Sequence, residues 1–125
     1  MKISLQIFQP SFILFSLLFS ITLISQNSAI SEKEKIQYLL NELEKSNLTF
    51  IRNGDEYSAK EARDHMQKKL DYAGNRITTV DQFITMIATK SSLSGKVYYV
   101  KYSDGKKIES ATYLRELLQK LEKLK

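Results

Sequence analysis

The feature that most constrains the fold is a short hairpin that runs directly into a capped helix. Residues 48–52 are rich in β-forming side chains, and Asn53-Gly54 follows them. This dipeptide is the strongest short-range hairpin signal, because both residues tolerate the positive φ angles of a type I′ turn. After a short returning strand, Ser58 and Glu61 fit a capping box, which marks the start of a helix. The order of these elements indicates a fold that mixes helices with antiparallel strands.

Three further helices are predicted from apolar residues that recur at helical spacing. The first begins at Ser31, which forms a capping box with Glu34. Thr78 or Thr79 caps the third helix of the chain, and Ser110 caps the last. The four apolar stripes in chain order are Ile36, Leu39, Leu40 and Leu43, then Ala62, Met66, Leu70 and Ala73, then Val80, Phe83, Ile84, Ile87 and Ala88, and finally Leu114, Leu117, Leu118, Leu121 and Leu124.

A second hairpin is predicted toward the C-terminus. In the strand over residues 97–102, Tyr98 and Val100 share one face, residues 103–106 turn the chain, and residues 107–109 return it. The predicted order is therefore helix–strand–strand–helix–helix–strand–strand–helix. We expect a single small α+β domain, with about four helices packed on one side of a small antiparallel sheet of two short hairpins.

The first 29 residues indicate a secretory signal peptide. Lys2 precedes an uncharged apolar run over residues 11–24, and small polar residues ending at Ala29 follow it. A basic start, an apolar middle and a small-residue end are typical of such peptides. The apolar run of 14 residues is also short of the ~20 that a membrane-spanning helix needs; an uncleaved anchor is the alternative. We predict a signal peptide at 1–29, a mature domain at 30–125, and export to the periplasm or out of the cell.

The composition excludes several kinds of site. The chain has no cysteine and a single histidine, His65. Disulfides, thiol nucleophiles and thiolate metal sites are therefore absent, and one histidine does not suffice for the usual zinc site. We expect no metal and no cofactor. The net charge of +5 falls to +4 when Lys2 leaves with the signal peptide. With export, this modest excess predicts no nucleic-acid partner, while attraction to anionic surfaces and peripheral membrane contact stay open.

The candidate ligand or interaction residues lie around the first hairpin and in a serine-rich loop over residues 90–96. A histidine titrates near neutrality and suits a general base or a proton-sensitive contact; the structural alternative is a histidine hydrogen-bonded to the hairpin. The loop serines suit anion binding, or a Ser-His-Asp site with Asp64 or Asp81, although no Gly-x-Ser-x-Gly elbow is present. We assign no catalytic residue. The candidates are Arg52, Asn53, Gly54, Tyr57, His65, Ser91, Ser92, Ser94 and Gly95.

Several blocks of the sequence resemble a known family. The most specific are Phe-Ile-Arg-Asn-Gly at 50–54 and Ser-Ser-Leu-Ser-Gly at 91–95. Over about residues 36–121 the chain resembles the YfeK-like family of small exported bacterial proteins of unknown function. It departs from the family pattern at Tyr113, where a tryptophan is expected. The resemblance implies export and supplies no activity.

Three functions follow as hypotheses. The first is a non-enzymatic binding or interaction module of the cell envelope, since no convincing catalytic constellation is present and Tyr98, Tyr99 and Tyr102 crowd one strand. The second is a small hydrolase that uses His65 with a serine of residues 91–94. The third is a peripheral binder of anionic envelope polymer or lipid. The partner would be an envelope protein or an anionic polymer. The basic residues considered for the third function are Lys60, Arg63, Lys68, Lys69 and the lysines near the C-terminus.

Overall fold

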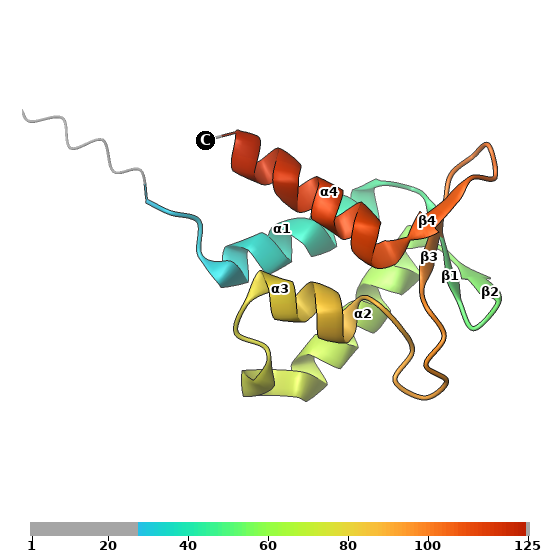
Figure 1. Ribbon diagram of the computed structural model, residues 1–125, viewed down its shortest axis with the longest axis horizontal. Helices are drawn as coiled ribbons and strands as arrows, with labels where there is room; N and C mark the ends of the chain where they lie inside the picture. The colour runs from blue at the N-terminus through green and yellow to red at the C-terminus, as the bar shows by residue number, and fades with distance from the viewer. Residues whose placement is uncertain (1–27, 125) are drawn as a thin grey trace, which may run out of the picture.

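The computed structural model describes residues 28–124, whose arrangement is shown in Figure 1. The signal peptide predicted at residues 1–29 therefore lies outside the described residues, apart from its last two positions. One 3₁₀ helix, η1, and one π-helical segment, η2, accompany the α-helices and strands. In chain order the elements are α1 (Glu32–Lys45), β1 (Thr49–Arg52), β2 (Asp55–Tyr57), α2 (Ala59–Ala73), η1 (Gly74–Arg76), α3 (Val80–Gln82), η2 (Phe83–Ile87), β3 (Tyr99–Lys101), β4 (Lys107–Glu109) and α4 (Ser110–Lys123).

The strands of the described chain form one antiparallel sheet in the order β2-β1-β3-β4. Figure 1 shows this sheet at one end of the molecule. Phe50 of β1 lies opposite Tyr57 of β2 and Val100 of β3, so the β1–β3 pair joins the two hairpins. The predicted fold class, an α+β domain with about four helices and a small antiparallel sheet of two hairpins, is confirmed.

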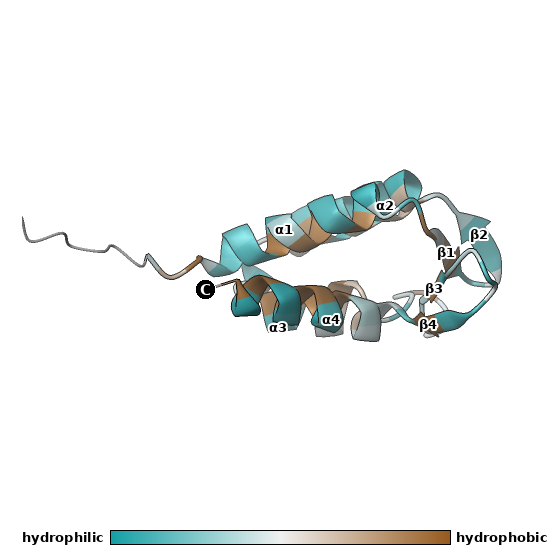
Figure 2. Cartoon of the chain, turned by 90° about the horizontal axis from the view of Figure 1, so that it is seen from above, coloured by the Kyte–Doolittle hydropathy of each residue, from teal (hydrophilic) through white to brown (hydrophobic). Residues whose placement is uncertain are grey.

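The core lies between two layers of helices, α1 with α2 and α3 with α4 (Figure 2). Each predicted apolar stripe contributes buried residues, and Phe50 and Val100 extend the core onto the sheet. Leu124 is an exception to the predicted stripe: it is 82% exposed, because α4 ends at Lys123. The largest fully buried apolar side chains are Phe83, Leu39, Leu40, Leu43, Ile84, Leu114 and Val100.

The first hairpin and the predicted caps of α1 and α2 form as expected. Asn53 and Gly54 have φ angles of 53° and 83°, the left-handed values that a type I′ turn requires. The side chains of Ser31 and Ser58 each complete a capping box. Thr79 caps α3, in a capping box with the glutamine three residues later.

Two local predictions were wrong. β3 covers only Tyr99–Lys101, because the Tyr98 N–H donates to the Thr89 carbonyl rather than to a sheet partner. Ser110 does not cap α4: Glu109 occupies the N-cap position, and Ser110 is already helical. The Ser110 N–H donates to the Tyr98 carbonyl, and β4 leads into the helix without a break. The Ser110 hydroxyl is buried and has no hydrogen-bond partner in the described chain.

The third predicted helix winds as a π-helix over most of its length. After one turn of α3, the Ala88 N–H donates to the Phe83 carbonyl at 3.1 Å, which is the i→i−5 pattern of a π-helix. Phe83, Ile84 and Ile87 stay buried. The segment ends beside α2, where the Ile87 carbonyl accepts a hydrogen bond from Lys69.

Candidate functional site around Arg52 and His65

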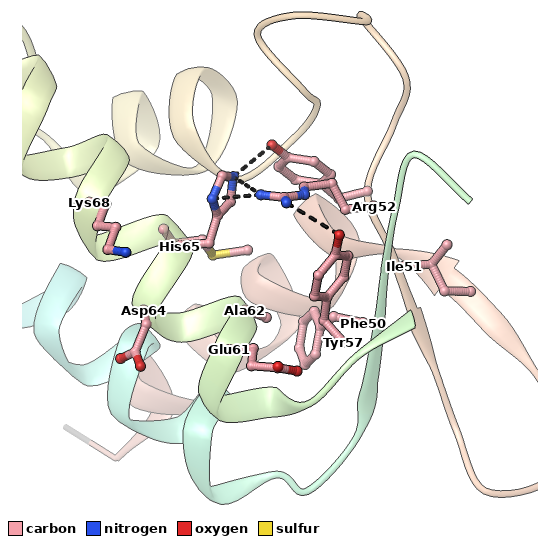
Figure 3. Close-up of a pocket in the computed structure, with 11 residues that line it drawn as sticks. Phe50, Ile51, Arg52, Tyr57, Glu61, Ala62, Asp64, His65 and Lys68 are labelled. Carbon is pink, nitrogen blue, oxygen red and sulfur yellow. Dashed lines mark hydrogen bonds between the residues drawn. The ribbon is translucent and has the colours of Figure 1, made fainter. Parts of the chain in front are cut away.

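The candidate site forms where α2 passes the sheet, and three elements position its side chains. His65 precedes the buried Met66 on α2, so its imidazole lies at the edge of the buried face of that helix. Arg52 ends β1, and Tyr57 ends β2. Figure 3 shows these two side chains and the imidazole pointing toward one another.

Arg52 is held by His65 and Tyr57. Its Nη1 atom lies 2.7 Å from Nδ1 and 2.9 Å from Nε2 of His65. Its Nη2 atom donates to the Tyr57 hydroxyl at 3.3 Å, and its guanidinium carbon lies 4.8 Å from the centre of the Tyr57 ring. A neutral imidazole has one donor and one acceptor nitrogen. Arg52 can only donate, so the acceptor nitrogen of the neutral imidazole is the one that it engages. Nε2 of His65 also lies 3.3 Å from the Tyr98 hydroxyl.

Lys69 closes the other side of the site. Its ammonium donates to the carbonyls of Ile87 at 2.8 Å and Lys90 at 3.1 Å, and to the Tyr98 hydroxyl at 3.3 Å. It also lies 5.1 Å from the centre of the Tyr98 ring, within the range of a cation–π contact. Lys69 therefore ties α2 to the end of η2 and to the loop that follows.

The electrostatics of the site oppose any further positive charge. Burial lowers the pKa of His65 below its ordinary value, and the positive charges of Arg52, Lys69 and Lys68 lower it further. Burial also lowers the pKa of Lys69, with a smaller contribution from Arg52. The pKa of the Tyr98 hydroxyl is raised by burial, against the opposing influence of Arg52. Burial and the neighbouring positive charges thus both favour the neutral form of the imidazole.

The carboxylates near the site are engaged elsewhere. The Glu61 carboxylate accepts the Ser58 N–H in the capping box, and Asp64 pairs with Lys60 and Arg63. In the part of the chain that the structure describes, no carboxylate lies within ion-pair distance of the site's three basic residues. These residues are Arg52, Lys68 and Lys69.

A pocket of about 320 Å³ opens beside these groups (Figure 3). The hairpin and the first half of α2 supply most of its wall, and Tyr98 supplies the remainder. Its lining includes both apolar and polar side chains, so the pocket combines an apolar surface with hydrogen-bonding groups. It is lined by Phe50, Ile51, Arg52, Tyr57, Glu61, Ala62, Asp64, His65, Met66, Lys68 and Tyr98.

The predicted candidate residues divide into two groups. Arg52, Tyr57 and His65 meet in the pocket. The other candidates shape the turns and the loop: the Ser94 hydroxyl donates to the Asn53 side chain, and the Ser91 hydroxyl accepts the Ser94 N–H. Gly54 and Gly95 adopt positive φ angles at turns, and Ser92 lines a neighbouring groove with His65.

The structure does not assemble a Ser-His-Asp site from the residues considered for one. Within residues 28–124, no hydrogen bond joins His65 to Ser91, Ser92 or Ser94. Asp64 is bound to Lys60 and Arg63, and Asp81 pairs with Arg115 at 3.0 Å. The imidazole is also engaged by Arg52 and Tyr98.

Sequence reasoning omitted Lys69 and Tyr98 from the candidate site residues. The signal for Lys69 is its position four residues after His65, which places both on one face of α2. Tyr98 gives no such signal, because its contact with His65 spans 33 residues. In the described residues, no helix is long and apolar enough to cross a membrane, and no three acidic or histidine side chains gather to hold a metal ion.

The fold and the site define a small, cysteine-free α+β domain with a pocket whose lining includes Arg52, His65 and Lys68 as well as Glu61 and Asp64. The chain belongs to DUF5329, a family of unknown function whose model matches residues 30–122. It is also 46% identical over 68 residues to the uncharacterized protein YfeK of Salmonella typhimurium. That match covers 54% of this chain and 57% of the Salmonella protein. No solved structure matches. The predicted membership in a YfeK-like family of unknown function is confirmed.

Proposed function

We propose that this protein is a non-enzymatic binding module of the bacterial cell envelope, and that its site around Arg52 and His65 binds an anionic group. The observation that carries the proposal is that Arg52 and Lys68 line the pocket with no carboxylate within ion-pair distance of either in the described chain. Glu61 and Asp64 also line the pocket, but Glu61 accepts the Ser58 N–H and Asp64 pairs with Lys60 and Arg63. Lys60 and Arg63, the basic residues that precede the site on α2, are by contrast paired with Asp64. Unpaired cations around a partly buried pocket create a potential that favours a negatively charged ligand.

The arrangement of Arg52 favours binding over catalysis. His65 and Tyr57 hold the guanidinium in place, and its remaining N–H groups are free to meet a carboxylate or phosphate. Because Arg52 occupies the acceptor nitrogen of His65, the imidazole must break that hydrogen bond before it can act as a base. The hydrolase alternative has no contact in its favour among the described residues.

The cell-envelope location has separate support. The sequence of residues 1–29 has the charge and hydropathy pattern of a signal peptide. The family model begins at residue 30, the first residue of the predicted mature domain. The resemblance to exported bacterial proteins points the same way.

The test uses the single histidine of the chain as a probe. The imidazole NMR signals of the full-length protein are followed through a pH titration, with and without inorganic phosphate at constant ionic strength. An anion beside Arg52 and Lys68 offsets the charges that lower the His65 pKa. Phosphate is therefore expected to move the His65 titration midpoint to higher pH.

Two arginine variants make this test specific. Arg52→Gln is expected to abolish the response to phosphate. Arg115→Gln removes an arginine that pairs with Asp81 and is absent from the pocket lining, so this control should respond as the unmodified protein does. An unchanged His65 signal at all phosphate concentrations, or an equal response in both variants, would overturn the proposal.

A further inference from the structure

A second hollow adjoins the anion site. This groove has a volume of about 600 Å³ and runs between the second half of α2 and the end of η2. His65 and Lys68 line both the groove and the first pocket, so the two spaces are continuous along one surface. The remaining lining residues are Lys69, Tyr72, Ala73, Arg76, Ile77, Met86, Ile87 and Ser92.

Large apolar side chains protrude around this groove. Tyr72 is 87% exposed and Met86 is 57% exposed, and both line the groove. Leu93 is 99% exposed and follows Ser92, which is also a lining residue. In Figure 1, the segment between η2 and β3 extends away from the helices as an open loop. Tyr72 and Met86 therefore expose apolar surface at a charged groove, and Leu93 exposes more in the adjoining loop, as is typical of an interaction surface.

The charge of the groove has one sign. Lys68, Lys69 and Arg76 line it, and the described lining residues include no aspartate or glutamate. Arg76 is held over Tyr72, with its guanidinium carbon 5.6 Å from the ring centre and its Nε atom bonded to the Ala73 carbonyl. The groove therefore presents cations at fixed positions beside protruding apolar groups.

We propose that this surface docks onto a lipid bilayer that contains anionic phospholipids. A lipid phosphate occupies the site of Arg52, His65 and Lys68, and Tyr72, Met86 and Leu93 enter the interfacial layer. We call these last three residues the apolar rim. A tyrosine suits this position because its ring is apolar and its hydroxyl is polar. Basic residues near a negatively charged leaflet are attracted by its surface potential. This inference rests on the proposed function, since the phosphate uses the same site.

The charge complementarity selects a bilayer over a neutral apolar partner. A neutral partner would leave the cations of the groove without counter-charge, whereas an anionic leaflet supplies phosphate at the depth where interfacial side chains lie. A soluble phosphate compound is the competing source of the anion. It needs Arg52 and Lys68 but makes no use of Leu93, which protrudes into solvent.

The experiment measures co-sedimentation of the full-length protein with vesicles of phosphatidylcholine, with or without phosphatidylglycerol. Binding is expected to be stronger when phosphatidylglycerol is present, and this difference should diminish as salt rises. Leu93→Gln is expected to reduce partitioning about tenfold, from the apolar transfer energy of a leucine side chain. Lys68→Gln is expected to reduce it about fivefold, from the attraction of one basic residue to an anionic leaflet.

Two control variants distinguish the contribution of this surface to vesicle binding from the contribution of the rest of the chain. Leu124→Gln alters another highly exposed leucine, which lies outside the groove, and Lys120→Gln removes one exposed charge from α4. Both should bind vesicles as the unmodified protein does. Every variant carries the same N-terminal segment, so the difference between Leu93→Gln and Leu124→Gln reports on the apolar rim alone.

The outcomes distinguish this inference from the proposed function. If His65 responds to inorganic phosphate but the protein ignores both vesicle types, the site binds a soluble anion and the bilayer inference is wrong. Equal binding to both vesicle types, or equal losses in Leu93→Gln and Leu124→Gln, also overturns it. If His65 does not respond to phosphate, the proposed anion site fails whatever the vesicles show.

Discussion

The molecule contains two units of the same order, strand–turn–strand–helix, and they differ in what their helices bury. The first unit is β1–β2–α2 and the second is β3–β4–α4. The inner face of α4 lies in the core through Leu114 and Leu117. On α2, Met66 is buried, while His65 and Lys69 beside it belong to the anion site. The comparison teaches that the same supersecondary motif can have two uses. In the second unit its helix packs into the core, whereas in the first unit its helix also supplies a polar site.

The largest loss of stability is expected from a substitution in the core of the second unit. Leu114→Ala removes a fully buried side chain and should lower the free energy of unfolding by about 2–5 kcal/mol. Leu70→Ala on α2 is the matched change, and it should cost less because Leu70 is only partly buried. Urea unfolding measures both. Equal losses would remove the distinction between the two helices.

The serine at the start of α2 should have an intermediate effect. The Ser58 hydroxyl accepts the Glu61 N–H at 3.1 Å, and the Glu61 carboxylate completes the capping box by accepting the Ser58 N–H. Ser58→Ala is expected to lower the free energy of unfolding by about 1 kcal/mol. Chemical denaturation measures the change, and Ser58→Asp should retain most of the stability because aspartate is also a good cap.

The serine at the start of α4 should behave in the opposite way. The Ser110 hydroxyl is buried without a hydrogen-bond partner in the described chain, and alanine is the better helix former. Ser110→Ala is expected to raise the free energy of unfolding by about 0.5–1 kcal/mol. The same denaturation assay tests it. A loss comparable to that of Ser58→Ala would show that the two serines play equivalent roles.

The smallest effect is the dependence of stability on pH that His65 of the first unit should cause near neutral pH. The folded-state pKa of His65 lies below its ordinary value of 6.5, so the unfolded chain binds a proton first as pH falls. The stability is fully present above pH 6.5 and decreases as pH falls from there toward the lower folded-state pKa. The groups facing the imidazole are Arg52 of β1, Lys68 and Lys69 of α2, and Tyr98 before β3.

A variant without the imidazole shows how much of the pH dependence of stability is due to His65. Unfolding free energies of the unmodified protein and His65→Gln are compared between pH 5.5 and 7.5, a range of about one unit on either side of the ordinary histidine pKa. The carboxylates with lowered pKa values titrate below this range, so they do not contribute a slope there. The slope should be smaller in His65→Gln. An identical slope in both proteins would place the effect outside His65.

The features that the sequence predicted correctly depend on local chemistry. The Asn53-Gly54 turn and the Ser58 cap are each determined by residues within three positions of one another. Ser110 occupies a similar place in the sequence, yet the bond from its N–H to the Tyr98 carbonyl makes it the first helical residue. The π-helical winding after Phe83 also escapes prediction, because its apolar spacing resembles that of an ordinary helix.

The part of the candidate site that was predicted correctly also depends on residues that are close together in the sequence. Arg52, Tyr57 and His65 lie within 14 positions and meet through one hairpin and one helix. Tyr98 joins them only because β1 pairs with β3 in the register that sets Ile51 opposite Tyr99. That register is a tertiary property, and periodicity along a single strand does not specify it.

The bond between Ser94 and Asn53 has a consequence for the evolution of this family. It joins the two sequence blocks that carry most of the resemblance, although 41 positions separate them along the chain. A substitution at either position removes this hydrogen bond and leaves the remaining side chain without that partner. We therefore expect the two positions to be selected together. Among relatives, replacements at position 53 should be accompanied by replacements at position 94 more often than chance predicts. The turn and the loop would then be inherited as a single unit.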